Sequence, residues 1–176
     1  MTYLVLFGKL VWFFLPVGFA NMAPVFFRHS LRALGKPIQT VWFGEHKTWR
    51  GLLVATIFGG VIFMVQYGLA SLWPAFQNIS PYPYGSFPIW FGFLLGGAAI
   101  GGDLLKSFVK RRFHVAAGAA WFPFDQVDFL IGGLLALLIY ASIPISHWVI
   151  VIGAGIIIPL LVNQIGYRLH LKDHPW

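Results

Sequence analysis

Five stretches of this chain are long and apolar enough to cross a lipid bilayer, and no other feature constrains the fold as strongly. They cover residues 3–27, 51–73, 88–105, 127–143 and 147–167. A helix needs about 20 mostly apolar residues to span the hydrocarbon core. Because the chain is also 59% hydrophobic and only 10% charged, we predict an all-α polytopic membrane protein of about five transmembrane helices. Residues 1–176 are expected to form a single domain, and Pro16 and Pro159 predict kinks or local breaks inside two segments.

The regions between these segments differ sharply in charge. Almost all lysines and arginines lie in residues 28–50, in residues 106–112 or in the C-terminal tail, whereas residues 73–87 and 142–146 contain none. Cytoplasmic loops carry an excess of Lys and Arg. The pattern therefore predicts an outside N-terminus, a cytoplasmic C-terminus and a multi-pass protein of the cell membrane with a cytoplasm-facing site. Trp73, Tyr82, Tyr84 and Trp148 suit an outer aromatic belt.

The net charge of +7 lies beside the membrane segments. This placement favours anionic lipid or a phosphate-bearing substrate as the partner, and we expect no nucleic-acid partner. The chain has no cysteine, which excludes disulfides, zinc–thiolate sites and a cysteine nucleophile. The absence of GK[ST], HExxH and GxSxG motifs removes the P-loop, zinc-protease and serine-hydrolase interpretations.

The acidic residues are the most informative polar side chains. There are only five, and all fall in the predicted cytoplasmic regions: Glu45, Asp103, Asp125, Asp128 and Asp173. On a continuous helix Asp103 shares a face with Lys106 and Lys110, and the two aspartates of the DQVD motif share a face if a helix has begun there. Three carboxylates at one membrane depth predict a site for a hard divalent cation such as Mg²⁺. The alternative is a set of headgroup-level charges that pair with one another.

Three further stretches have two interpretations each. In FGEHKTWRG, residues 43–51, Lys47, Thr48 and Arg50 are donors for phosphate oxygens, or the stretch is an ordinary cationic loop. In ANMAPV, residues 20–25, Asn21 serves a site, or it satisfies carbonyls exposed by Pro24 at a helix kink. In GFLLGGAAIGG, residues 92–102, the small residues allow close helix packing, or they line a groove for lipid chains.

Taken together, the motifs resemble the CDP-archaeol synthase family of CTP-dependent lipid cytidylyltransferases, distant relatives of the CDP-diacylglycerol synthases. The resemblance rests on ANMAP at 20–24, FGEHKTWRG at 43–51, GDLLKSFVKRRF at 102–113, FPFDQVDFLIGG at 122–133 and LKDHPW at 171–176. It implies transfer of CMP from CTP to 2,3-di-O-geranylgeranylglyceryl phosphate, giving unsaturated CDP-archaeol and pyrophosphate with Mg²⁺ as cofactor. The chain departs from the wider synthase pattern at Lys106-Ser107 and at DQVD, and both departures favour a prenyl-ether lipid.

The resemblance also implies roles for individual residues. The metal ligands fall on Asp103, Asp125 and Asp128, and we expect these aspartates and Lys106 to be the catalytic positions. The resemblance places the CTP phosphates among Lys47, Arg50, Lys106, Lys110, Arg111 and Arg112, and we add Asn21 and His46 as further phosphate-binding candidates. The expected partners are CTP, a prenylated glycerol phosphate lipid and the bilayer. Two other functions remain open: a phosphatidate cytidylyltransferase, which uses diacyl lipid, and a lipid-phosphate or anion transporter.

Overall fold

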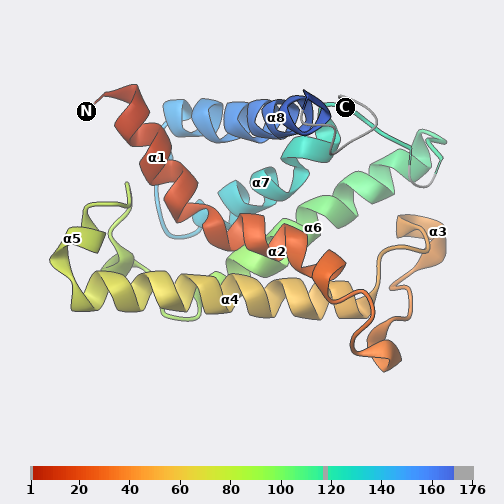
Figure 1. Ribbon diagram of the computed structural model, residues 1–176. Coiled ribbons are helices and arrows are strands. Elements are labelled where there is room, and N and C mark those ends of the chain that lie inside the picture. The colour runs from red at the N-terminus through yellow and green to blue at the C-terminus, as the bar shows by residue number, and fades with distance from the viewer. Residues whose placement is uncertain (1, 117–118, 169–176) are drawn as a thin grey trace.

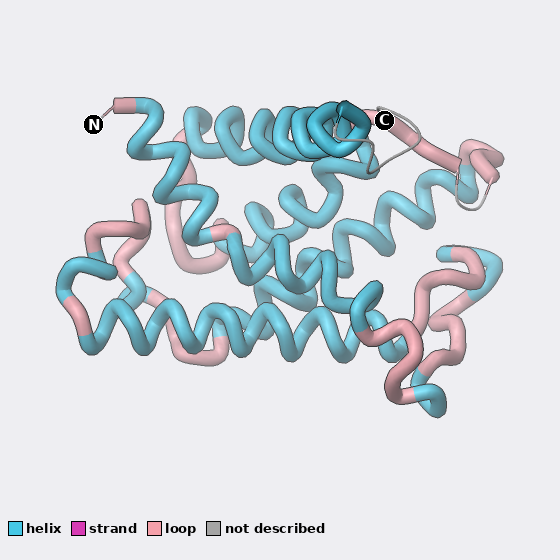
Figure 2. The backbone as a smooth tube through the Cα atoms, in the orientation of Figure 1, coloured by secondary structure: helices cyan, strands magenta, loops and turns pink. Residues whose placement is uncertain are grey.

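The computed structural model describes residues 2–116 and 119–168, and within these ranges the chain is helical, with no β-strand (Figures 1 and 2). The long helices are α1 (Tyr3–Phe13), α2 (Leu15–Phe26), α4 (Trp49–Leu72), α6 (Phe91–Arg112), α7 (Phe124–Leu137) and α8 (Ile145–Arg168). The short helices α3 (Thr40–Phe43) and α5 (Pro74–Gln77) lie in the loops at opposite ends of α4 (Figure 1). The motif LKDHPW lies outside the described residues.

The helices identify a membrane-embedded protein. Among the described residues, α4, α6 and the first 18 residues of α8 are long and apolar enough to cross a bilayer, and α1 with α2 makes a fourth span if the bent pair is one span. Helix α7 has 14 residues, about 21 Å at 1.5 Å per residue, which is shorter than the hydrocarbon core. All five predicted segments therefore appear as helices. Three or four of them meet the length and hydropathy of a full span.

The first segment is divided where the sequence places Pro16. Helices α1 and α2 meet at an angle of 46°, and Pro16 stands in the first turn of α2. Proline has no N–H to donate to the carbonyl of Trp12, four residues earlier. The buried side chain of Gln66 on α4 donates to that carbonyl instead, at 2.6 Å. The prediction of a break at Pro16 is confirmed, whereas Pro159 lies inside α8 without dividing it.

Glycines bring α6 into backbone contact with both of its neighbours. A Cβ atom added to Gly96 would lie 2.5 Å from the carbonyl oxygen of Ala55 on α4. A Cβ atom on Gly102 would lie 2.1 Å from the carbonyl oxygen of Asp128, and one on Gly132 would lie 2.0 Å from that of Ala98. Because no side chain fits in these contacts, the close-packing interpretation of residues 92–102 is correct for these faces of α6.

At the α5 end of the molecule, aromatic rings form the core. Phe63 packs against Tyr84, Phe87 and Phe91 with ring centroids 5.7, 6.2 and 5.4 Å away. Tyr82 is also buried, and its hydroxyl lies 2.6 Å from Nδ1 of His147. Burial raises the pKa of both tyrosines to about 12. The prediction that they belong to a surface belt is wrong, because the loop 79–87 folds inward over the helix ends.

Candidate active site

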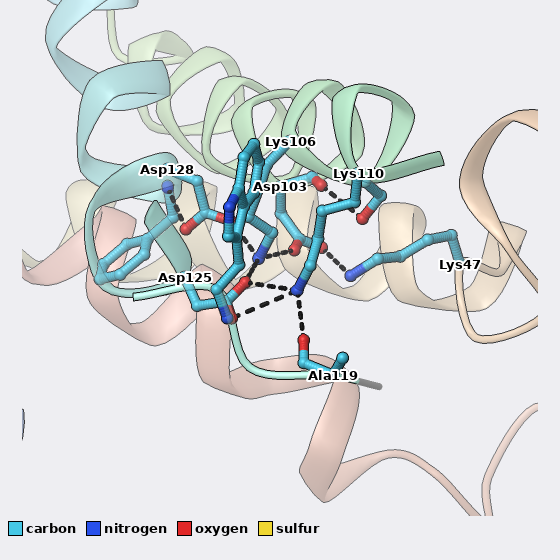
Figure 3. A network of polar contacts seen from close by, with 10 residues as sticks. Lys47, Asp103, Lys106, Lys110, Ala119, Asp125 and Asp128 are labelled. Atoms are coloured by element: carbon cyan, nitrogen blue, oxygen red, sulfur yellow. Dashed lines mark hydrogen bonds and ion pairs between the residues drawn. The ribbon is translucent and has the colours of Figure 1, made fainter. Parts of the chain in front are cut away.

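A cluster of three aspartates lies where α6 and α7 touch. The backbone contact at Gly102 puts its neighbour Asp103 beside Asp128 on α7. Asp125 lies one turn earlier in α7, on the same helix face as Asp128. Figure 3 shows the three carboxylates directed toward one another around the side chain of Lys106. The sequence pattern predicts this gathering, and the glycine contact is its physical cause.

Lys106 stands at the centre of this aspartate cluster. Its Nζ atom lies 3.1 Å from Oδ1 of Asp103, 2.9 Å from Oδ1 of Asp125 and 2.6 Å from Oδ2 of Asp128. The side chain of Lys106 is 13% exposed and that of Asp128 only 6%. The ion pair with Asp103 follows from the helical spacing of three residues. The other two contacts depend on the packing of α7 against α6.

Lys110 and the loop before α7 fix the position of Asp125. Lys110 is buried, and its ammonium donates to the carbonyl of Ala119 at 2.6 Å and to the two carboxylate oxygens of Asp125 at 3.1 and 3.3 Å. The backbone N–H of Trp121 donates to the same carboxylate. Burial raises the pKa of Asp125, but the Lys106 ammonium and the Trp121 N–H lower it by more, so this pKa lies below its usual value.

A loop at the start of α4 brings a third lysine to the aspartate cluster. Thr48 caps α4 by accepting the N–H of Gly51 at 3.2 Å. The N–H of Ile38 donates to the carbonyl of Lys47 at 2.8 Å, which ties the two halves of the loop together. The Lys47 ammonium thereby reaches Oδ2 of Asp103, to which it is both hydrogen-bonded and ion-paired.

Two polar cavities lie beside the aspartate cluster. The smaller, of about 230 Å³, has a mixed lining in which the basic side chains are His46, Lys47, Lys106, Lys110 and Arg111. The larger, of about 460 Å³, is lined among others by Arg28, His46, Lys47, Arg50 and Asp103. We call them the small and the large polar pocket. Their walls share His46 and Lys47, so the two pockets adjoin along the loop before α4.

A separate apolar groove runs along α6 and α7 and reaches the cluster at Lys106 and Asp128. Its volume is about 550 Å³, and we call it the α6–α7 groove. The side chains that line it are Leu94, Ala98, Leu105, Lys106, Val109, Trp121, Phe124, Val127, Asp128, Ile131, Leu135, Ala136 and Ile139, together with Gly101, Gly102 and Gly132. Its charged members are Lys106 and Asp128 alone. The glycine-rich stretch therefore serves both predicted purposes, since one face packs against helices and another lines a groove.

The predicted phosphate-binding residues fall into two groups. His46, Lys47, Arg50, Lys110 and Arg111 line one or both polar pockets. Arg112 lines neither pocket, and its guanidinium lies 4.8 Å from the ring centre of Phe108. Asn21 is also absent from both linings, and among the described residues its side chain makes no hydrogen bond.

The sequence interpretation missed two parts of the site. Arg28 lines the large polar pocket, and the cationic composition of residues 28–50 was the signal that could have found it. The carbonyl of Ala119 holds Lys110 and the N–H of Trp121 holds Asp125. The sequence carries no signal for these contacts, because backbone donors and acceptors are the same in every residue but proline.

The carboxylates of the aspartate cluster are ligands suited to a hard divalent cation. Within residues 2–116 and 119–168 no three acidic or histidine side chains are arranged as ready metal ligands, and Lys106 Nζ occupies the point that the three aspartates share. Yet Oδ2 of Asp128 is buried and has no hydrogen bond of acceptable geometry, despite the nearby ammonium. Carboxylate oxygens are the ligands that Mg²⁺ and Ca²⁺ prefer. The residues therefore fit a divalent cation once the ammonium has moved aside.

Comparisons with known proteins point to one family. The CarS-like family of CDP-archaeol synthases matches residues 2–176. A CDP-archaeol synthase of Methanoculleus marisnigri is 38% identical over 146 residues, which cover 76% of this chain and 81% of the relative. Those of Thermococcus kodakarensis and Pyrococcus abyssi are 33% and 32% identical, over 94% of this chain and 94% and 95% of their own. No solved structure matches the chain.

Proposed function

The chain belongs to the CDP-archaeol synthase family, and from this premise we propose that the aspartate cluster and the cavities beside it form the active site. The protein is a CTP-dependent cytidylyltransferase that forms CDP-archaeol. In this reaction an oxygen of the lipid phosphate forms a bond to the α-phosphorus of CTP. The bond from that phosphorus to the bridging oxygen breaks, and pyrophosphate leaves with the electron pair.

One observation carries the assignment of the site: Lys106 lines both the α6–α7 groove and the small polar pocket. The reaction joins an apolar lipid to a highly charged nucleotide, so its site needs an apolar and a polar compartment that meet at a cation. Lys106 stands at that junction, and its ammonium, which pairs with the three aspartates in this structure, would reach phosphate oxygens by exchanging carboxylate contacts for them. It would neutralise charge where the new bond forms, which is the main catalytic requirement of phosphoryl transfer.

The nucleotide belongs on the polar side. Lys47 and His46 are shared by the two polar pockets, and Arg111 and Arg50 add guanidinium groups. Such groups bind phosphate oxygens through charge-assisted hydrogen bonds. We assign these four side chains to the triphosphate. Lys110 is instead assigned to holding Asp125, because its three N–H groups already have acceptors.

The lipid belongs in the α6–α7 groove. Most of this groove is lined by apolar side chains, and its two charged lining residues are Lys106 and Asp128. Such a lining suits an isoprenoid chain that ends in a phosphate. The phosphate is already an anion near neutral pH, so no strong general base is needed. The groove and the pocket contribute mainly by holding the two phosphates next to each other.

A divalent cation, Mg²⁺ by the resemblance to the CDP-archaeol synthase family, would be held by Asp103, Asp125 and Asp128. Bound there, it supplies positive charge to phosphate oxygens. The remaining residues act without it: Lys47 orients Asp103, while Lys110 and the Trp121 N–H orient Asp125.

The arrangement in the cell follows from the charge bias of the loops. We propose five membrane-crossing segments in one domain over residues 1–176, with the N-terminus outside and the aspartate cluster at the cytoplasmic face of the cell membrane. The cationic loops and the aspartate cluster lie at the same end of the helices (Figures 1 and 3), which supports this orientation. Both CTP and the lipid phosphate could then reach the site.

The test is a transfer assay with purified protein, Mg²⁺ and CTP labelled at the α-phosphate. With 2,3-di-O-geranylgeranylglyceryl phosphate we expect label in the lipid and an equal amount of pyrophosphate. Phosphatidate, presented in the same micelles, tests the diacyl alternative and should be the poorer acceptor. Absence of CTP-dependent transfer to every lipid phosphate would contradict the proposed function.

A further inference from the structure

Lys106 occupies the point at which a divalent cation would bind the three aspartates. We propose that this ammonium is a built-in occupant of the cation site, which holds the aspartate cluster together in the metal-free enzyme and is displaced when a divalent cation binds. This role of Lys106 is additional to its place at the lipid–nucleotide junction. It rests on the proposed function only for the assignment of the aspartates as metal ligands.

The geometry distinguishes Lys106 from its neighbours. Among the ion pairs of the described residues, only Lys106 reaches all three aspartates, at 2.6 to 3.1 Å. Lys110 pairs with Asp125 alone, and Lys47 pairs with Asp103 alone. The ammonium of Lys106 therefore has the position of a shared central ion, whereas the other two lysines lie at the edge.

Charge and burial make the two occupants mutually exclusive. The three aspartates are matched by three ammonium groups, those of Lys47, Lys106 and Lys110. Since Lys106 and Asp128 are largely buried, their charges are poorly screened by solvent. A divalent cation added beside Lys106 would meet a like charge at short range, while removal of Lys106 with nothing in its place would leave buried carboxylates unpaired.

The structure also offers the displaced ammonium a destination. Lysine has a flexible four-carbon stem, and Lys106 already lines the small polar pocket, where Lys47 and Arg111 are close by. An additional cation is unfavourable in that pocket unless an anion is present. Nucleotide phosphates would supply the anion, so displacement of Lys106 should be easier when the pocket is filled.

The experiment measures Mn²⁺ binding without nucleotide or lipid, by the electron paramagnetic resonance signal of the free ion. The variants are Lys106→Met and, as matched controls, Lys110→Met and Lys47→Met. Each removes one ammonium from the same cluster, but only the first removes the central occupant. We expect Lys106→Met to bind Mn²⁺ at least about tenfold more tightly than the wild type and each control to gain no more than about threefold, as expected for a more distant charge. Equal gains in all three variants, or no gain at Lys106→Met, would overturn the proposal.

Thermal unfolding of the same variants in detergent is a second measurement, and it also detects a variant that folds poorly. Lys106→Met should unfold at a lower temperature than the wild type in EDTA, and Mn²⁺ should restore more of the loss than it does for either control. Lys106→Gln, which keeps a hydrogen-bond donor, should lose less stability in EDTA. If Mn²⁺ raises the unfolding temperature of wild type and Lys106→Met equally, Lys106 does not compete with the cation. Because neither measurement uses CTP or lipid, their failure is distinguishable from failure of the transfer assay.

Discussion

The same helices build an aromatic end and a charged end, and the two are held together in opposite ways. Toward α5, Phe63, Tyr84, Phe87 and Phe91 fill the space between α4 and α6 with fully packed rings. Toward α3, Asp103 and its partners fill the space with paired charges beside open cavities. Packed rings contribute stability without chemistry, whereas paired charges next to cavities can exchange partners when a substrate arrives. The contrast supports the proposal that the charged end holds the active site and the aromatic end serves stability.

The charged end should lose activity far more than stability when one carboxylate is neutralised. In Asp128→Asn the side-chain shape is kept, but a buried oxygen beside Lys106 loses its charge. We expect the rate of CMP transfer to fall about 10²- to 10³-fold, the usual loss when one preorganised electrostatic group is removed from an active site. The measurement is the initial rate at saturating CTP, lipid and Mg²⁺. A rate within about threefold of the wild type would remove Asp128 from the chemistry.

The aromatic end should behave in the opposite way. Phe63 is fully buried among other rings, and Phe63→Ala leaves a cavity, so the free energy of unfolding should fall by about 3 kcal/mol. Unfolding in mixed detergent micelles measures this change. At a temperature where both proteins remain folded, the transfer rate of Phe63→Ala should stay near that of the wild type. A loss as large as that of Asp128→Asn would contradict the division between the ends.

The contact of α6 with α7 couples stability to the site, so a change there should affect both. In Gly132→Ala the new Cβ would lie 2.0 Å from the carbonyl oxygen of Ala98, and the helices must move apart. We expect a loss of about 2 kcal/mol in stability from overpacking and roughly a tenfold or greater loss of transfer, because Asp128 moves away from Lys106. Gly68→Ala, on α4 where an added Cβ meets no atom within 4 Å, is the control and should lower neither stability nor transfer.

A single substitution in the α6–α7 groove should affect binding of the lipid phosphate without affecting binding of CTP. Gly101 lines this groove, and an added Cβ there meets no atom within 4 Å. Gly101→Phe should therefore fill the groove, raising KM for the lipid phosphate about tenfold, a typical effect of a changed apolar pocket, while KM for CTP stays the same. Gly68→Phe, outside the groove, serves as the size-matched control. An unchanged KM for lipid, or an equal rise for CTP, would place the lipid elsewhere.

Local sequence rules predicted the elements well, because they depend on residues close in the chain. The apolar segments became helices, and Pro16 divided the first of them because its missing N–H cannot be compensated within the same helix. Helix α6 continues to Arg112, past the apolar segment that ends at residue 105, and so places Asp103, Lys106 and Lys110 on one continuous helix, as their spacing requires. The fourth segment is already short in the sequence, but the end of α7 at Leu137 was not evident, because residues 138–143 are as apolar as the helix before them.

Features that depend on how helices cross could not be predicted. The gathering of three aspartates was foreseen from their shared depth, but the central position of Lys106 requires the contact of Gly102 with α7. The same crossing decides which glycines pack and which line the groove. The inward fold of Tyr82 and Tyr84 also escaped prediction, because an aromatic belt and an aromatic core have the same composition.

The central claim is that lipid and nucleotide meet at Lys106 from two separate cavities, and photolabelling tests it most directly. The reagent is 2,3-di-O-geranylgeranylglyceryl phosphate with a photoreactive diazirine in one chain, and the labelled residues are identified by mass spectrometry. We expect label in the α6–α7 groove, at positions such as Leu105, Ile131 and Leu135, and less of it in Gly101→Phe. A second apolar groove, lined among others by Phe19, Met22 and Ile158, lies along α2 and α8. Label confined to that groove would contradict the account.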